Sequence, residues 1–311
     1  MNKKVIAMAV TAALAAPLAA QASDLKISGR VASDLTSSKG GTEFIDLGQS
    51  RLQFDVSDES GWFARYAQDI RLGRLQGEIA NTVALTPKFG TDRDFFVGTK
   101  VGNGSLAFGR ITNVGANMEK DAFIGTFLEL RNAAVAGGAY GSASFMNNDI
   151  QYKMKAGAMS IGVDYILPDS ASDQGHYGLA LSGKAGNMGY YVGLNNGNAG
   201  TSGATKGVTK AGIRMPLGGM DLAVGYDAVD DSSDTTNKVH LGVGMKMGGG
   251  LLDVTFADKG ADGTNSFYRV GYMKKASDSV SWHVGASQNG SATSLSAAND
   301  MVVGAGVIVK F

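Results

Sequence analysis

The chain has 311 residues, no cysteine, and equal numbers of basic and acidic residues, 28 of each. The balanced charge argues against a nucleic-acid-binding protein, which needs an excess of positive charge, and the absence of cysteine excludes a disulfide framework. Glycine is frequent (45 residues) and proline is rare (4), which favours many turns and closely packed strands over a collagen-like repeat.

The first 22 residues have the pattern of a secretory signal peptide. Lys3 and Lys4 precede an apolar run over about 5–14, and Ala20-Gln21-Ala22 follows. A basic start, a short apolar run and an A-x-A site are the three parts of such a signal, and the run is too short to span a bilayer. We therefore predict a cleaved signal peptide over 1–22 and one mature domain over 23–311, which is 311 − 22 = 289 residues.

The mature chain alternates apolar with small or polar residues. A period of two predicts β-strands, and no stretch approaches the roughly 18 apolar residues that a membrane helix needs. Sixteen strands are expected, at about 25–35, 44–55, 61–71, 93–101, 104–111, 146–155, 158–167, 175–185, 187–195, 206–216, 219–228, 237–248, 250–258, 265–275, 279–288 and 300–311.

The connections between these strands alternate in length. Short, turn-like connections are expected around 102–104, 156–157, 186, 217–218, 249 and 276–278. Long polar connections are expected at about 36–43, 72–92, 112–145, 196–205, 229–236 and 289–299. Short turns at one end and long loops at the other are typical of outer-membrane barrels, and an even strand count places both termini at the short-turn end.

The last strand, 300–311, indicates how the sheet closes. One face carries Val303, Ala305, Val307, Val309 and Phe311, and the other is mostly small and ends in a charge, Lys310. Pairing of this strand with the first would remove both sheet edges; the alternative is a buried terminal strand of a soluble sandwich. A sixteen-stranded cylinder is too wide for side chains to fill. We therefore expect a water-filled interior and an outer apolar face toward lipid, with interfacial aromatics at Phe95, Tyr152, Tyr165, Tyr226 and Phe311.

Several stretches then resemble a known family. They are D-L-G-Q-S-R-L-Q-F over 46–54, G-W-F-A-R-Y over 61–66, D-R-D-F-F-V-G-T over 92–99, G-S-L-A-F-G-R over 104–110, N-D-I-Q-Y over 148–152 and G-V-D-Y over 162–165. With the C-terminal Phe311, the chain resembles the general diffusion porins of Gram-negative bacteria. The pair R-D-x-F-V-G and G-x-L-x-x-G-R is the most specific part of this likeness.

This resemblance implies an all-β fold: a transmembrane antiparallel barrel of sixteen strands, forming a homotrimer among the lipid and lipopolysaccharide of the outer membrane. Each barrel would pass small hydrophilic solutes and ions by passive diffusion, without cofactor, metal or nucleic acid. The resemblance also implies that the loop after the fifth strand folds inward and constricts the barrel. That loop lies within about 112–145 and lacks the P-E-F-G-G of the best-known enteric porins.

A pore needs a width limit and charges that set the local potential. Arg51 and Arg65 alternate with outward-facing apolar residues, so both should point inward, and Arg30 and Lys100 pass the same test. Arg110 has the outward parity; it enters through the family motif and lies either at a strand end or after a bulge. We expect basic side chains on the wall to face acidic loop residues, in a constriction made of Arg30, Arg51, Arg65, Lys100, Arg110, Glu119 and Asp121. The alternative is that these charges only solvate the lumen or pair with one another.

Selectivity follows from the same parity argument. Thirteen basic and eight acidic residues have the inward parity, which predicts a mild preference for anions. The basic ones are Arg30, Arg51, Arg65, Arg71, Lys100, Lys153, Lys155, Lys184, Lys210, Arg214, Lys246, Arg269 and Lys310, and the acidic ones are Asp55, Asp69, Asp94, Asp149, Asp164, Asp221, Asp227 and Asp253. Acidic residues in the long loops, including Asp230 and Asp231, would favour cations at the mouth. A channel specific for phosphate or another anion is an alternative.

A barrel of this kind could also be an enzyme or a closed structural protein. The sequence has no G-x-S-x-G and no H-E-x-x-H, which are motifs of hydrolases. His176, His240 and His283 have the inward parity, whereas an outer-membrane lipase should act at the outer wall. We expect no catalytic residue. A structural or adhesive barrel would differ from a pore in having its interior plugged.

Overall fold

The computed structural model describes residues 24–45, 50–71, 88–130, 145–168, 175–197, 207–230, 235–258, 266–288 and 300–311. The predicted signal peptide, 1–22, lies outside them. The strands are β1 (Asp24–Ser38), β2 (Gly41–Ile45), β3 (Arg51–Ser57), β4 (Trp62–Arg71), β5 (Lys88–Val101), β6 (Gly104–Thr112), β7 (Phe145–Ala156), β8 (Met159–Ile166), β9 (His176–Ala185), β10 (Met188–Gly197), β11 (Gly207–Leu217), β12 (Met220–Asp230), β13 (Thr235–Met247), β14 (Gly250–Asp258), β15 (Phe267–Lys275), β16 (Val280–Gln288) and β17 (Met301–Lys310). None of the described residues belongs to a helix long and apolar enough to cross a membrane.

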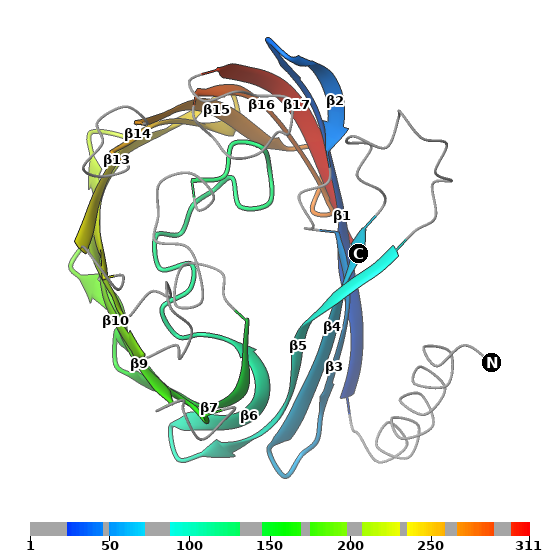
Figure 1. The fold of residues 1–311 in the computed structure, drawn as a ribbon, viewed down its shortest axis with the longest axis vertical. Coiled ribbons are helices and arrows are strands. Elements are labelled where there is room, and N and C mark those ends of the chain that lie inside the picture. The colour runs from blue at the N-terminus through cyan, green and yellow to red at the C-terminus, as the bar shows by residue number, and fades with distance from the viewer. Residues whose placement is uncertain are drawn as a thin grey trace.

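The strands form one closed antiparallel sheet (Figure 1). β17 pairs with β1, with Arg30 opposite Lys310 and Ser37 opposite Val303. β2 and β3 both pair with β1 and together occupy one place in the ring, so the seventeen strands make sixteen positions. The predicted sixteen-stranded barrel and the pairing of the last strand with the first are therefore confirmed.

The second position of the barrel differs from the prediction of one strand over 44–55. Ile45 lies opposite Asp34, whereas Arg51 lies opposite Arg30, so the pairing register with β1 shifts between β2 and β3. Here the Ser50 hydroxyl accepts a hydrogen bond from the Ala32 N–H at 3.0 Å. A side chain thus satisfies a backbone donor where the irregular backbone interrupts the ladder.

The short turns lie at one end of the barrel, together with the start of β1 and the end of β17. The six predicted short turns all join paired neighbouring strands. Gly157 and Gly218 have φ of 59° and 58°, a region that glycine enters without steric cost. The C-terminus lies on the first strand, where the Phe311 N–H donates to the Gly29 carbonyl at 3.1 Å. The Phe311 ring covers Gly29, since a Cβ there would lie 2.5 Å from the Phe311 Cζ.

The two faces of the wall differ as the alternation predicts. On the outside, Leu241, Val303 and Val307 are 46%, 46% and 43% exposed. On the inside, charged side chains such as Lys210 and Arg269 are buried. Exposed aliphatic side chains around the whole described wall would be costly in water, so this outer surface suits the hydrocarbon core of a bilayer.

Candidate functional site: the interior of the barrel

Residues 113–130, which follow β6, lie inside the ring (Figure 1). The Val114 N–H donates to Asp164 Oδ2 of β8 at 2.8 Å. The Phe127 N–H donates to Asp34 Oδ2 of β1 at 2.7 Å. Both carboxyl groups are buried. The segment therefore crosses the interior from β8 to β1 and is held by wall carboxylates near both of its ends.

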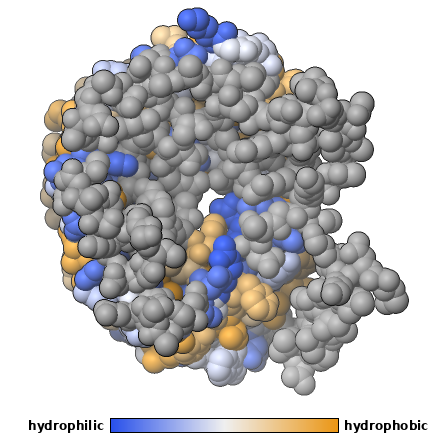
Figure 2. Space-filling view, viewed as in Figure 1, coloured by the Kyte–Doolittle hydropathy of each residue, from blue (hydrophilic) through white to orange (hydrophobic). Residues whose placement is uncertain are grey.

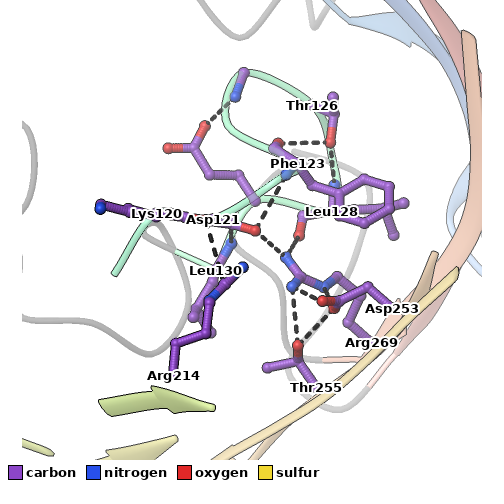
Figure 3. A network of polar contacts seen from close by, with 12 residues as sticks. Lys120, Asp121, Phe123, Thr126, Leu128, Leu130, Arg214, Asp253, Thr255 and Arg269 are labelled. Atoms are coloured by element: carbon purple, nitrogen blue, oxygen red, sulfur yellow. Dashed lines mark hydrogen bonds and ion pairs between the residues drawn. The ribbon is translucent and has the colours of Figure 1, made fainter. Parts of the chain in front are cut away.

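Arg269 of β15 is the most connected anchor of this segment (Figure 3). Its Nη1 donates to Asp121 Oδ1 and to the Leu128 carbonyl, each at 2.8 Å. Its Nη2 donates to Asp253 Oδ1 of β14 at 2.6 Å and to the Thr255 hydroxyl at 2.8 Å. One buried guanidinium therefore joins two carboxylates, one from the segment and one from the wall.

A second ion pair holds the middle of the segment. Glu119 pairs with Lys210 of β11, and the Lys210 side chain is completely buried. The next residue of the segment is also held by β11, because Arg214 Nη2 donates a hydrogen bond to the Lys120 carbonyl at 3.4 Å. Figure 3 shows the Lys120 side chain pointing away from the Asp121–Arg269 pair. The acidic side chains of 119 and 121 thus face the wall, and the basic side chain between them does not.

Glycines on the inner wall provide space for the apolar side chains of the segment. The pairs are Val114 with Gly162, Met118 with Gly193, Phe123 with Gly271 and Leu128 with Gly285. A Cβ would lie 2.6 Å from the Phe123 ring at Gly271 and 2.8 Å from Leu128 Cδ1 at Gly285. The side chains of the segment therefore pack directly against the backbone of the wall, which explains why glycine is needed at these wall positions.

Across the ring, the inner wall of β3 and β4 carries basic side chains. Arg65 Nε donates to Asp55 Oδ1 at 2.6 Å, and this pair is partly exposed. Arg51 makes no hydrogen bond or ion pair with any described residue, and its pairing positions are Asp69 of β4 and Arg30 of β1. Positive charge on this wall is therefore only partly neutralised.

The predicted site residues are thus divided between two walls. Arg30, Arg51 and Arg65 lie together on β1, β3 and β4. Lys100 is exposed and lies one residue from the end of β5, beside the short 102–103 turn. Glu119 and Asp121 contact neither Arg51 nor Arg65; they pair with Lys210 and Arg269 instead.

Arg110 lies at an irregularity in its strand. The β6–β7 register shifts between Gly109 and Ile111, and Gly109 has φ of 140°. Arg110 Nη1 donates to Asn147 Oδ1 at 2.8 Å, and the guanidinium lies 5.6 Å from the centre of the Phe145 ring. Arg110 thus lies at this irregularity and two residues before the end of β6, and on the β5 side its position is opposite the outward-facing Phe95.

Sequence reasoning missed Arg93 as an interior residue. Its Nη1 pairs with Asp69 Oδ1 of β4 at 2.9 Å, and both side chains are buried. The parity count placed Arg93 outside, but the β4–β5 register shifts at 66–68, which breaks the alternation. Strand parity predicts an inward side chain for its partner Asp69, as it does for Lys210 and Arg269. Parity does not predict which of the inward residues pair with one another.

The three histidines are buried on separate strands, β9, β13 and β16. His283 Nε2 lies 2.7 Å from Asp34 Oδ1, the carboxyl group that also holds Phe127. Tyr191 Oη lies 3.5 Å from His240 Nε2. No group of three or more His, Cys, Asp or Glu among the described residues could hold a metal ion.

Figure 2 shows an opening near the middle of the ring, with hydrophilic residues on part of its edge. Arg51, the partly exposed Arg65 and Lys120 of the segment carry charges that are open to the interior or solvent. Apolar walls around water concentrate the field of such charges. Chemically, this arrangement can attract or repel ions.

A family model described as "Gram-negative porin" matches residues 7–297. The chain belongs to the Gram-negative porin family. A search of curated proteins found no match. Among solved structures, this porin is similar to a loop-deletion mutant of OmpT, an outer membrane protein of Vibrio cholerae, with 13% identity, TM-score 0.65, and 93% and 99% of the two chains covered.

A triple mutant of Rhodopseudomonas blastica porin is also similar, with 11% identity, TM-score 0.67, and 93% and 100% of the chains covered. A third similar structure is the trimer form of in-vitro folded OmpT, with 14% identity, TM-score 0.64, and 93% and 99% of the chains covered. At such identities the likeness shows the fold. The family and the barrel together make this protein an outer-membrane channel.

Proposed function

We propose that this porin is a non-enzymatic homotrimer whose barrels each pass small hydrophilic solutes and ions by passive diffusion, with a preference for anions. Residues 1–22 are removed on export, and residues 23–311 form the barrel domain. The preference rests on one observation: Glu119 and Asp121 of the segment are buried in ion pairs. Arg51 has no ion pair with a described residue, and Arg65 and Lys120 keep partly or fully exposed side chains.

The physical argument concerns the potential that a passing ion meets. A unit charge about 7 Å from an ion contributes about 0.6 kcal/mol in bulk water and about 2.4 kcal/mol at an effective dielectric constant of 20. Two or three basic groups beside one narrow opening therefore change the local anion-to-cation ratio several-fold or more. Glu119 and Asp121 contribute less to this field, because Lys210 and Arg269 neutralise them at contact distance.

In this proposal the predicted residues have three roles. Arg51 and Arg65, with the additional Lys120, set the potential of the constriction formed by 113–130. Arg30 and Lys100 extend the basic wall toward the short-turn end. Glu119, Asp121 and Arg110 shape the constriction by fixing its segment and the adjoining β6–β7 bulge.

The test is current through the purified protein in a planar bilayer, under a KCl gradient. We expect stepwise conductance, with insertions in threes, and a reversal potential of anion sign. The double variant Arg51→Gln, Arg65→Gln should lower the anion-to-cation permeability ratio several-fold. Lys274→Gln is the matched control, since Lys274 has the outward parity on β15, opposite Trp282, and should change nothing.

Two results would contradict the proposal at different levels. A wild-type reversal potential of cation sign would remove the anion preference but leave the pore. A correctly folded barrel without conductance would remove the pore itself and favour a closed structural barrel.

A further inference from the structure

Two phenylalanine rings lie next to each other on the inner wall, among residues that are mostly polar or small. Phe63 of β4 follows Trp62, whose side chain is 52% exposed on the outer wall. Phe96 of β5 follows Phe95, which is 60% exposed on the outer wall. Successive strand residues point to opposite faces, so both Phe63 and Phe96 face inward. Each is partly exposed.

The two rings form one preformed apolar surface. Their centroids are 6.3 Å apart and their planes meet at 81°, an edge-to-face arrangement that aromatic pairs favour. Phe63 also lies over Gly98 of β5, where a Cβ would be 2.5 Å from its Cζ. Within the described part of the chain, the two rings contact each other and Arg65, and no aromatic side chain of segment 113–130 stacks on them. The segment therefore does not account for this apolar surface.

Arg65 provides a charged group at the edge of this surface. Its guanidinium carbon lies 5.7 Å from the centre of the Phe96 ring. Its Nε donates a hydrogen bond to Asp55, and the Arg65 side chain is 37% exposed. Within the described residues, its Nη1 and Nη2 have no hydrogen-bond partner. Two N–H-bearing nitrogens are therefore available beside two aromatic rings.

We propose that Phe63, Phe96 and Arg65 form a binding site for small aromatic carboxylates. The ring of the solute packs against the two phenylalanines, and its carboxylate accepts hydrogen bonds from the free end of the Arg65 guanidinium. A guanidinium matches a carboxylate in charge and geometry, and an added aromatic ring gains from edge-to-face contacts. This inference rests on the proposed pore and names a solute class for it.

The first experiment uses the wild-type channel and needs no variant. Chloride current is measured in a planar bilayer while sodium benzoate, sodium acetate or benzyl alcohol is added on one side. Benzoate should reduce the current at concentrations roughly tenfold below acetate, because an aromatic contact adds a factor of about 2 to 13 to binding. Benzyl alcohol, which has the ring without the carboxylate, should block no better than acetate.

The second experiment assigns the effect to these residues. Phe63→Leu with Phe96→Leu should remove the difference between benzoate and acetate. The matched control is Phe54→Leu with Tyr66→Leu, a stacked pair on the outer face of β3 and β4 with centroids 6.4 Å apart, and it should keep the difference. Arg65→Gln alone should weaken block by benzoate and leave benzyl alcohol unaffected, which provides a test if the double phenylalanine variant does not fold.

The outcomes separate the two proposals. Equal block by benzoate and acetate in a conducting, anion-preferring wild-type channel would overturn the aromatic site and leave the proposed function intact. A benzoate preference that survives both Phe63→Leu with Phe96→Leu and Arg65→Gln would also overturn it. A folded channel with no chloride current would overturn the proposed function first.

Discussion

Arg269→Met should release one half of the segment 113–130 from the wall. Methionine has a similar length but cannot donate a hydrogen bond. The change removes the bonds to Asp121, Asp253, Thr255 and the Leu128 carbonyl. It leaves two carboxylates close together without the cation that neutralised both. The part of the segment that follows Asp121 would then separate from β14 and β15 so that its carboxylate reaches water.

The size of the effect follows from burial. The Arg269 and Asp121 side chains are 2% and 3% exposed, and Asp253 is 13% exposed. Removing one partner of a buried ion pair costs about 3–5 kcal/mol. At about 1.4 kcal/mol per factor of ten, local opening should become on the order of a hundred- to a few-thousand-fold more frequent. Val114 is held separately by Asp164, so its end of the segment should stay in place.

Hydrogen exchange of the porin in lipid nanodiscs measures this opening directly. The Leu130 N–H, which donates to Asp121 Oδ2 at 2.7 Å, should exchange faster by that factor in the variant, whereas the Val114 N–H should not change. Asp121→Asn and Asp253→Asn added to Arg269→Met should restore most of the protection, since no unpaired charge remains. Unchanged exchange at Leu130 in Arg269→Met would refute the reasoning that this guanidinium holds the segment.

Three further changes test other parts of the fold. Gly271→Val should displace the Phe123 ring, because even a Cβ would lie 2.6 Å from it, and should destabilise the barrel by about 1–3 kcal/mol in guanidinium unfolding; an unchanged midpoint would contradict this. Phe311→Ala should slow barrel closure, measured as the refolding rate into detergent, and an unaltered rate would argue against a role for this ring. A hydrogen bond from Ser60 lowers the pKa of Asp58, so its stabilising effect is present above the unfolded pKa and is lost as pH falls. The unfolding midpoint of Asp58→Asn should therefore lie below that of wild type at pH 7, and the gap should narrow below about pH 4; a gap that widens in acid would reverse the sign.

Strand parity located most, but not all, of the interior charges. It assigned Lys210, Asp253 and Arg269 correctly to the inner wall, because their strands keep an unbroken register. It failed at Arg93, where the register of β4 and β5 shifts. A bulge inserts one residue into a strand, and no residue type marks its position in the sequence. Each such residue inverts the parity of the rest of its strand. Parity is therefore reliable only between irregularities.

The sequence by itself determined the class of fold and how it closes. The alternation of apolar and small residues, the sorting of short turns to one end and the aromatic C-terminus are local properties, and each is readable because side-chain direction in a strand repeats every two residues. The pairing of the interior charges depended on the tertiary structure. Glu119 and Asp121 meet Lys210 and Arg269, which are 210 − 119 = 91 and 269 − 121 = 148 residues away in sequence. The closed ring brings β11 and β15 beside a segment that follows β6. Only closure fixes which wall a loop residue reaches, and so only the fold separates the paired Glu119 and Asp121 from exposed charges such as Lys120.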